Sequence, residues 1–289
     1  MIVVVLQGGL GNQLFQYAAA KALAVKRKTD VYIDTSSLQL DGNITKRKYE
    51  LDAFNIKARF ATLRMIRDIE HPSGIKKLKR KFASTYKKGI YNEPYYHYDR
   101  FFLMASSTTI VRGYFQSQRY FGFISDIIRD EFIVAGKLSE RTIALGEHIL
   151  HSNSVSIHIR RGDYVSNIET GKFHGCCGLE YYEKAIHIIT SKVSSTEFFI
   201  FSDDMEWARQ NLKIDFPTTF VDHNGEPNAY EDLYLMSLCK HNIIANSSFS
   251  WWGAWLNKNP GKVVVAPARW FNESNADTKD LLPEEWIKA

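Results

Sequence analysis

Four ionisable side chains crowd into six positions at the end of one predicted strand, in the order His158, Arg160, Arg161 and Asp163. Residues 154–159 alternate polar and β-branched apolar types, which places His158 and Arg160 on one face of the strand and Arg161 on the other. A guanidinium beside a glycine at a strand end suits bidentate contact with a phosphate. The other arginine can then pair with Asp163 and hold the loop. A purely structural Arg–Asp pair is the alternative, but burying such groups is costly unless they are paired or liganded, which favours a ligand site.

A glycine-rich turn, Gly8-Gly9-Leu10-Gly11-Asn12-Gln13, joins the first predicted strand to the first predicted helix. Glycines let a backbone approach a ligand closely, and a helix N-terminus offers unpaired N–H groups to a phosphate or sugar oxygen. Asp34 lies where a dinucleotide-binding fold places the acidic residue that binds the ribose. The third glycine of the G-x-G-x-x-G pattern is, however, replaced by Leu14. A nicotinamide site is therefore disfavoured, and a turn that only packs stays open as the alternative.

Small hydroxyl residues precede a predicted helix rich in aromatic residues, in the segment Asn246-Ser247-Ser248-Phe249. Hydroxyls and N–H groups at a helix start can hold an anion, and the alternative is that Ser247 or Ser248 is a simple N-cap. Asp232, on the preceding predicted helix, carries a carboxylate that could accept two N–H donors of a guanine. The run Ser202-Asp203-Asp204 could hold a ribose, but a cap for the helix 205–211 is the favoured interpretation.

The motifs of other phosphate and hydrolase chemistries do not occur in the sequence, which has no GxxxxGK[ST], HExxH, GxSxG or Asp-x-Asp element. The three cysteines, Cys176, Cys177 and Cys239, lack the spacing of a zinc site or a disulfide framework. We therefore expect no metal and no cofactor, and the charge of a bound diphosphate would be met by protein cations.

The net charge of +5 over 289 residues comes from one segment. Residues 57–88 hold eleven basic and two acidic side chains, whereas the remainder holds 26 basic and 30 acidic ones. This distribution argues against a nucleic-acid partner, because the basic charge does not extend over the chain. Ile75, Leu78, Phe82 and Tyr86 recur at helical spacing within the segment, which predicts a short amphipathic helix beneath a lysine-rich surface.

The elements that position these residues form two α/β series. Strand 2–6, helix 13–28 and strand 31–33 open the first series, with another strand predicted at 109–114. The second series alternates strands and helices from Ser154 to Ala266, and its polar loops follow the strands. Ligands on parallel sheets bind at the carboxyl ends of strands. We place the domain boundary near residue 150, which gives domains of residues 1–150 and 151–289.

The motifs resemble those of the α1,2-fucosyltransferases of glycosyltransferase family 11, in particular the bacterial type. The resemblance covers essentially the whole chain and rests on GGLGNQ-LFQYA at the start, GYFQSQRYF at 113–121, HIRRGDY at 158–164, FSDD at 201–204 and NSSFSWWGAWL at 246–256. The HxRRxD element is shared more widely with α1,6- and protein O-fucosyltransferases. The resemblance implies a GT-B-like α/β fold with two Rossmann-type domains facing across a cleft, an N-terminal acceptor-side domain and a C-terminal GDP-fucose-binding domain.

The resemblance also assigns site residues. Arg160 would stabilise the diphosphate leaving group, with His158 beside it, and Asp232 would contact guanine. His158 and Asp163 are the candidates for a general base, which the sequence does not identify. The residues implied for donor binding are Gly9, Gly11, Asn12, His158, Arg160, Asp232, Ser247, Ser248 and Phe249.

The implied reaction is an inverting, metal-independent transfer of L-fucose from GDP-β-L-fucose to the 2-hydroxyl of a terminal galactose. The acceptor would be a galactoside-containing oligosaccharide or a lipid-linked glycan of O-antigen, capsule or other surface-glycan synthesis. Another linkage, 1,3 or 1,6, is the runner-up, and a non-catalytic protein that binds GDP-sugars or glycans is the alternative of a different class.

The location of the protein is a separate expectation. The first residues lack the basic region of a signal peptide, and no apolar run reaches the roughly 18 residues that a membrane span needs. We therefore expect a cytoplasmic protein at the inner face of the cytoplasmic membrane. Two interpretations of residues 76–88 stay open, a solvated face and a peripheral contact with anionic lipid.

Overall fold

Two compact units make up the chain, as a computed structural model shows. The structure describes residues 1–38, 47–162, 172, 175–225, 228–272 and 276–289. Unit 1 comprises Met1–Gly136 with Asp277–Leu281, and unit 2 comprises Lys137–Ala276 with Leu282–Ala289. Two units match the two domains expected from the sequence, but the first boundary falls after Gly136 instead of near residue 150. The physical reason is that helix α5 (Glu140–His151) packs against helix α10 (Ala229–Leu238) of unit 2.

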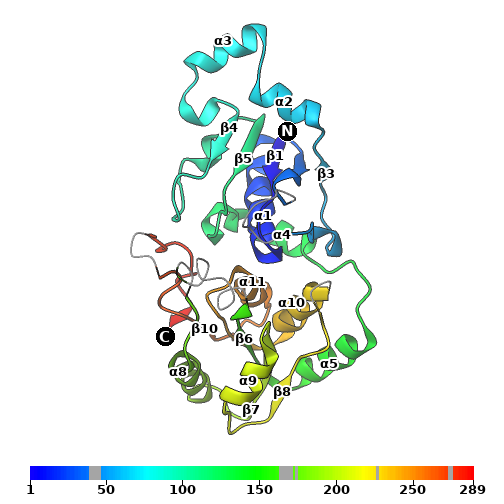
Figure 1. The fold of residues 1–289 in the computed structure, drawn as a ribbon, viewed down its shortest axis with the longest axis vertical. Helices are drawn as coiled ribbons and strands as arrows, with labels where there is room; N and C mark the ends of the chain where they lie inside the picture. Colours follow the sequence, from blue (N-terminus) through cyan, green and yellow to red (C-terminus); the bar gives the residue numbers. More distant parts are fainter. Residues whose placement is uncertain (39–46, 163–171, 173–174, 226–227, 273–275) are drawn as a thin grey trace. The chain divides into compact units, whose positions relative to one another are not determined.

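A five-stranded parallel sheet forms the centre of unit 1, with the strand order β3-β2-β1-β5-β4 (Figure 1). Strand β1 lies in the middle, and its four residues are all buried, as a continuous apolar run at the centre of a parallel sheet requires. The elements of unit 1 are β1 (Ile2–Val5), α1 (Leu10–Arg27), β2 (Val31–Asp34), β3 (Arg59–Phe60), α2 (Leu63–Glu70), α3 (Gly74–Phe82), β4 (Ile90–Asn92), β5 (Thr109–Arg112) and α4 (Ser125–Glu131).

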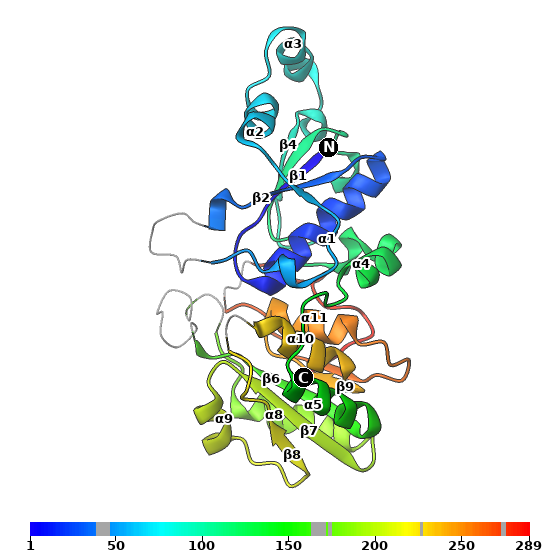
Figure 2. The same ribbon diagram turned by 90° about the vertical axis from the view of Figure 1, so that its right-hand side faces the viewer.

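Helix α1 packs along this sheet against β1 and β2 (Figure 2). Its alanine-rich face is fully buried, and its two last-turn cations, Lys26 and Arg27, lie where they complement the helix dipole. Nearer the middle of the same helix, the buried Tyr17 hydroxyl donates to Glu131 at 2.5 Å, and Lys21 pairs with the other oxygen of that carboxylate. These contacts attach α4 to α1.

Unit 2 is built on a six-stranded parallel sheet with the strand order β11-β10-β9-β6-β7-β8. Strand β6 is central, between β9 and β7. The elements of unit 2 are α5 (Glu140–His151), β6 (Asn153–Ile159), α8 (Leu179–Thr190), β7 (Thr196–Ser202), α9 (Met205–Asn211), β8 (Thr218–Phe220), α10 (Ala229–Leu238), β9 (His241–Ile243), α11 (Ser248–Leu256), β10 (Val264–Ala266) and β11 (Ile287–Lys288).

The two faces of β6 carry different chemistry, as the alternation of its residues predicts. Val155, Ile157 and Ile159 belong to one buried core with side chains of α8 and α9. On the opposite face, Ser156 accepts a hydrogen bond from Asn242 of β9 at 2.7 Å, and that amide also donates to a carbonyl of α10. The sheet of unit 2 is therefore covered by helices on both faces, which is the layering of a doubly wound α/β fold.

One prediction about α3 is wrong. The spacing of Ile75, Leu78 and Phe82 does produce a helix, but these side chains are 74%, 60% and 80% exposed instead of covered. Tyr86, the fourth residue of the predicted pattern, lies beyond the end of the helix. The helix lies at one end of unit 1, joined to the rest through α2 and β4 (Figure 1). Among the helices described, none is both long enough and apolar enough to cross a membrane.

Candidate active site

The arginine that the strand pattern singled out, Arg160, lies at the carboxyl end of β6 and forms an ion pair with Asp203. Its Nη1 atom is 3.1 Å from the Asp203 Oδ2 atom, and the two side chains are 27% and 23% exposed. Asp203 follows β7, which pairs with β6 in parallel register, so the two side chains meet at the same edge of the sheet. A guanidinium presents five N–H donors in a planar fork, a geometry that suits the oxygens of carboxylates and phosphates.

Arg161 points to the other side of the sheet, as the alternation predicts. Its Nε atom is 3.4 Å from Asp204, and its guanidinium carbon lies 4.0 Å from the centroid of the Trp207 ring. Both contacts attach the loop to the start of α9. The sequence assigned this loop-holding pair to Asp163, which lies outside the described residues; the described partner of Arg161 is Asp204.

Asp203 organises the loop that follows β6. Its carboxylate accepts hydrogen bonds from the backbone N–H of Arg161 at 2.8 Å and of Gly162 at 2.9 Å, in addition to the ion pair with Arg160. A Cβ atom at Gly162 would lie 2.6 Å from Asp203 Oδ2, so the close approach requires glycine. Asp204 accepts from the Trp207 N–H as the N-cap of α9, which confirms the predicted cap.

His158 lies beneath Arg160 on the same face of β6, and it is 5% exposed. Its ring packs against Phe249 at the start of α11, with centroids 5.6 Å apart. Burial, together with the nearby positive charge of Arg160, lowers the pKa of His158 to about 3. Within the described part of the chain, its Nδ1 atom is buried without a hydrogen-bond partner. A neutral imidazole with an unused polar atom therefore lies directly behind the arginine.

The first turn of α11 begins at the carboxyl end of β9. Ser247 is the N-cap and accepts from the Phe249 N–H at 3.4 Å, so the capping alternative applies to this residue. Ser248 and Phe249 are half-buried, and both lie in this first turn. Asn246 fixes the approach to this turn because its amide donates to the carbonyls of Gly175 and Trp270.

Asp232 occupies the first turn of α10, where its Oδ1 atom accepts a hydrogen bond from Asn224 at 2.8 Å. Burial raises the pKa of Asp232 to about 7, although the bond from Asn224 opposes the shift. Its neighbour Glu231 has a different function. Glu231 is 2% exposed as a residue, and its carboxylate accepts from both the N–H and the hydroxyl of Ser139, the N-cap of α5.

Sequence reasoning missed the polar group around Asp232. His223 and Asn224 follow β8, and both contact the Thr142 hydroxyl of α5. The signal that was available is the position of residues 222–224 directly after a predicted strand, at the edge of the sheet where ligands bind. The same signal identifies Asp203 as the partner of Arg160, since adjacent parallel strands end at the same edge.

The remaining predicted donor-binding residues lie in unit 1, in the turn between β1 and α1. Gly8 has a φ of +75°, and a Cβ atom there would lie 2.5 Å from the Asn12 amide. Gly9 is the N-cap of α1, where a glycine offers no side chain to cap the helix, and Gly11 lies in the first turn. The Asn12 Oδ1 atom accepts from Gln116 at 2.8 Å, which joins the turn to the segment 113–121.

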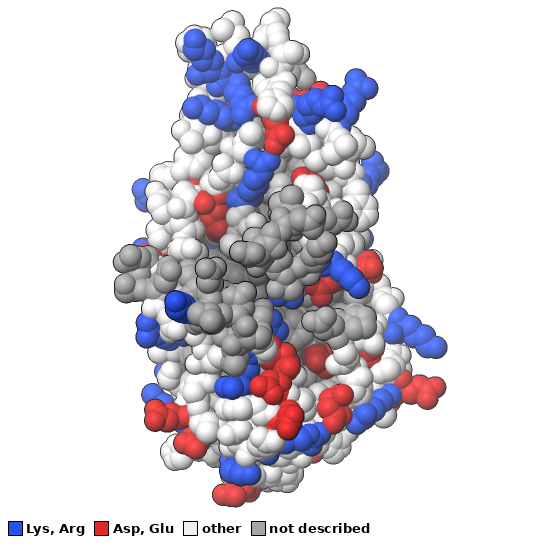
Figure 3. Space-filling view, in the orientation of Figure 1, with Lys and Arg blue, Asp and Glu red and all other residues white. Residues whose placement is uncertain are grey.

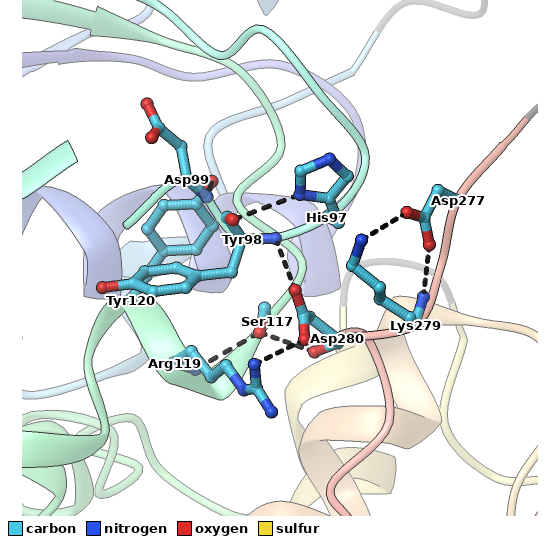
Figure 4. Close-up of polar contacts among 9 residues, drawn as sticks. All are labelled: His97, Tyr98, Asp99, Ser117, Arg119, Tyr120, Asp277, Lys279 and Asp280. Carbon is cyan, nitrogen blue, oxygen red and sulfur yellow. Dashed lines mark hydrogen bonds and ion pairs between the residues drawn. The ribbon is translucent and has the colours of Figure 1, made fainter. Parts of the chain in front are cut away.

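Segment 113–121 is itself held by two carboxylates of unit 1. Glu93 accepts from the N–H groups of Tyr114 and Phe115, and burial raises the pKa of its carboxyl group. Asp280 is the second anchor (Figure 4): its carboxylate forms an ion pair with Arg119 at 2.7 Å and accepts from the Tyr98 N–H at 3.2 Å. Its carbonyl also accepts from the Ser117 hydroxyl at 2.6 Å.

The structure thus brings together five of the predicted residues in unit 2, namely His158, Arg160, Ser247, Ser248 and Phe249, at the carboxyl ends of β6 and β9. Asp232 lies in the same unit, at the start of α10, and Gly9, Gly11 and Asn12 lie together in unit 1. Among the residues that the structure describes, no three His, Cys, Asp or Glu side chains are grouped so that they could hold a metal ion.

Comparison with known proteins gives matches over most of the chain. The family model described as glycosyl transferase family 11 matches residues 62–289. An α-1,2-colitosyltransferase of Escherichia coli is 36% identical over 292 residues, covering 100% of this chain and 98% of that protein. The O-antigen biosynthesis glycosyltransferase WbnK of the same organism is 35% identical, covering 98% of each. A shorter match, 31% identity over 36% of this chain and 30% of the relative, is to galactoside α-(1,2)-fucosyltransferase 2 of Rattus norvegicus.

Solved structures with the same fold have little sequence identity to this chain. NodZ, an α-1,6-fucosyltransferase from Bradyrhizobium, in a crystal soaked with GDP-fucose, has a TM-score of 0.53 at 15% identity, covering 90% of this chain and 96% of NodZ. A point mutant of Arabidopsis thaliana FUT1 in complex with GDP has a TM-score of 0.53 at 12% identity, covering 95% and 72%. These likenesses confirm the GT-B-like α/β fold that the sequence resemblance implied.

Proposed function

Because the chain belongs to glycosyltransferase family 11 and is a glycosyltransferase, we propose that it transfers L-fucose from GDP-β-L-fucose to the 2-hydroxyl of a terminal galactose, with inversion. The single observation that carries this proposal is Arg160, held by Asp203 at the carboxyl end of the central strand β6. A cation preorganised at the edge of a parallel sheet is suited to a diphosphate leaving group. Two of the relatives are α1,2-transferases by name, which supports this linkage.

In the proposed reaction, the acceptor hydroxyl attacks the anomeric carbon of the fucosyl unit while the bond from that carbon to the β-phosphate oxygen of GDP breaks. The acceptor proton passes to a base, for which Asp163 is proposed, or to water, and negative charge accumulates on GDP. Arg160 stabilises that charge, and its ion pair with Asp203 orients the guanidinium before the reaction starts. The N–H group of Ser248, in the first turn of α11, supplies a further donor to the phosphates, and Phe249 lies beside it.

Asp232 recognises guanine in this proposal. Its carboxylate must be ionised to accept the two N–H donors of the base, and a pKa near 7 makes this contact sensitive to pH. Gly9, Gly11 and Asn12 of unit 1 are proposed to contact the donor through the turn before α1. Unit 2 would then be the donor-binding domain and unit 1 the acceptor-side domain.

His158 is proposed to act as a neutral hydrogen-bonding group beside Arg160. An imidazole with a pKa of about 3 is a weak proton acceptor at neutral pH, so a role as general base is unfavourable. Asp163 remains the other proposed base. A dissociative transition state, in which the leaving group departs early, needs little assistance from a base.

Transfer is proposed to need no metal ion and no cofactor, because Arg160 supplies positive charge where the diphosphate would bind. The proposal predicts full activity in the presence of EDTA. Surface-glycan synthesis is the proposed setting, with an oligosaccharide or lipid-linked glycan as acceptor, by analogy with the O-antigen glycosyltransferase WbnK.

Colitose is the second candidate for the transferred sugar, because the relative with 36% identity is a colitosyltransferase. Colitose lacks the 3-hydroxyl of fucose, so the two donors differ by one polar group. A site that hydrogen-bonds this hydroxyl would discriminate strongly against the deoxy sugar, whereas an apolar site would discriminate weakly.

Product analysis tests the proposal. The purified chain is incubated separately with GDP-fucose and GDP-colitose and a panel of β-galactoside acceptors, and the products are analysed by mass spectrometry and linkage analysis. An α1,2-linked fucosyl product is expected with GDP-fucose. A 1,3 or 1,6 linkage, higher kcat/KM with GDP-colitose, or GDP binding without any transfer would each overturn the proposal as stated.

A further inference from the structure

The exposed face of α3 carries three apolar side chains that nothing in the proposed reaction uses. Ile75, Leu78 and Phe82 are 74%, 60% and 80% exposed, although water contact of three such groups on one helix is unfavourable. At about 100° per residue, they fall within about 60° of one another and so form a single stripe along the helix. We name this set, Ile75, Leu78 and Phe82, the apolar stripe.

Arg80 fixes the direction in which the apolar stripe points. Its guanidinium donates to the carbonyls of Ile69 at 3.0 Å and Glu70 at 2.8 Å, at the C-terminus of α2. Arg80 lies about 180° around the helix from the centre of the stripe. Of the α3 side chains that the structure describes, only Arg80 is partly buried. The stripe therefore faces away from the body of unit 1.

Cations lie on both sides of the stripe. Lys79 and Lys81 are each about 80° from its centre, on opposite sides, and both are exposed. Figure 3 shows Lys and Arg side chains gathered at the end of unit 1 where α2 and α3 lie. Beside the stripe, an open hollow of about 650 Å³ is lined by Gly74, Lys77, Leu78, Arg80, Lys81 and Lys88.

We propose that α3 docks this protein on an anionic phospholipid surface, with the apolar stripe inserted among the acyl chains and the flanking lysines at the level of the phosphates. An apolar stripe bordered by lysines matches the arrangement of a membrane interface, in which headgroup charge lies above hydrocarbon. The hollow beside the stripe offers cations to further headgroup phosphates. A helix of nine residues gives reversible, peripheral binding.

Other occupants match the surface less well. A nucleic acid would pair with the lysines but leave the apolar stripe in water. A second copy of this chain on a two-fold axis would bring the same lysines against one another. The anionic membrane surface is the partner that uses both the apolar and the basic side chains, and its binding does not depend on the identity of the transferred sugar.

Vesicle co-sedimentation of the full chain tests the proposal. Vesicles of phosphatidylcholine alone are compared with vesicles that also contain phosphatidylglycerol, without glycan or donor. Binding to the anionic vesicles is expected, and the paired variant Leu78→Ser/Phe82→Ser should weaken it about tenfold or more. The paired variant Lys79→Glu/Lys81→Glu should also weaken it by at least tenfold, because each lysine near an anionic surface contributes roughly fivefold.

Matched controls use residues of unit 2. Ile143→Ser/Leu150→Ser removes two apolar side chains that are 48% and 53% exposed on α5, and Lys184→Glu/Lys192→Glu reverses two exposed lysines. Both controls should bind vesicles as the unchanged chain does. All variants should keep their thermal unfolding midpoint and their transfer rate with a soluble acceptor.

Four outcomes would overturn the proposal. The first is no binding to anionic vesicles at low salt, and the second is binding that the Leu78→Ser/Phe82→Ser pair leaves unchanged. The third is tighter binding to duplex DNA than to vesicles, with the same dependence on Lys79 and Lys81. The fourth is a dimer in solution that the apolar pair dissociates, which would make the stripe an interface between copies.

Discussion

Arg160 and Arg161 are adjacent in sequence but have different surroundings, and this difference can be tested. Arg160→Ala is expected to lower kcat by about 10²–10³, because it removes a preorganised donor to the leaving group. Arg161→Ala is expected to lower the unfolding midpoint with a smaller effect on kcat, because Arg161 stacks on Trp207 and pairs with Asp204. Steady-state kinetics and thermal unfolding of both variants provide the measurement. Equal, mild losses of kcat would contradict the assigned roles.

Asp203 should behave as a positioning residue for Arg160. Asp203→Asn keeps the size of the side chain but removes the ion pair and one of the acceptors for the loop N–H groups. We expect kcat to fall while the KM for the acceptor stays within about twofold, and we expect Asp204→Asn, the cap of α9, to change kcat much less. An Asp203→Asn variant with unchanged kcat would show that Arg160 is held in place without the carboxylate.

Asp232 should make stability depend on pH. Its pKa is raised in the folded chain to about 7 from an ordinary value of 3.8, so the folded state favours the protonated form. The stability that this group contributes is fully present below pH 4 and is lost as the pH rises through about 7. Asp232→Asn should therefore raise the unfolding midpoint relative to the unchanged chain at pH 8 but not at pH 4.

The same group gives the opposite pH trend for donor binding. If the carboxylate contacts guanine, GDP affinity should increase as the pH rises through about 7, and Asp232→Asn should bind weakly at every pH. Asn224→Ala is the matched variant: losing its hydrogen bond should move both profiles to higher pH. Titration calorimetry with GDP measures the effect, and a GDP affinity that is flat between pH 5 and 9 in the unchanged chain would argue against guanine recognition by Asp232.

At the scale of the elements, Ser139 has two functions at the start of α5. It is the N-cap, accepting from the Thr142 N–H at 3.2 Å, and it donates to the buried Glu231 of α10 at 2.8 Å. Ser139→Ala should cost about 2–3 kcal/mol, since it removes a cap and leaves a buried carboxylate with one bond fewer. Thr62→Ala removes a cap of α2 with the same 3.2 Å geometry and no second bond in the described structure, and it should cost about 1 kcal/mol. Urea unfolding compares the two, and equal costs would exclude a stabilising effect of the Glu231 contact.

The prediction of elements from sequence succeeded where local signals are strong. Helices α8 and α9 begin and end at the predicted residues, because apolar spacing and the Asp204 cap are local properties. Strands β3, β4 and β11 were not predicted. They have only two or three residues each, and they become strands because a neighbouring edge of a sheet supplies hydrogen-bond partners.

At the scale of the whole molecule, the chain leaves unit 2 at Asp277, contributes Asp277–Leu281 to unit 1, and returns to unit 2 at Leu282. Asp280 lies within this short segment. Asp280→Ala should destabilise unit 1 by about 2 kcal/mol, because it leaves the Tyr98 N–H and Arg119 without this carboxylate. The interaction free energy between Asp280 and Arg119 alone should be about 1 kcal/mol or less, since the Arg119 side chain is half exposed. A double-mutant cycle with Arg119→Ala separates these contributions, and limited proteolysis should show new cleavage near residues 277–281. An unchanged unfolding free energy would mean that the Ser117 contact alone anchors the segment.

The sequence by itself determined the α/β class, the strand that carries Arg160 and the opposite directions of Arg160 and Arg161, because strand alternation is a property of the local backbone. Only the tertiary structure decided which carboxylates meet these arginines, that His158 is buried and neutral, and that the boundary falls before α5. These three features depend on which strands are neighbours in the sheet and on which helices cover each face. Neighbouring strands of a parallel sheet come from segments that are distant in sequence, so local patterns do not reveal them. The apolar stripe of α3 illustrates the same division. Helical spacing predicted its existence, but only the packing of Arg80 on α2 determined that it faces solvent.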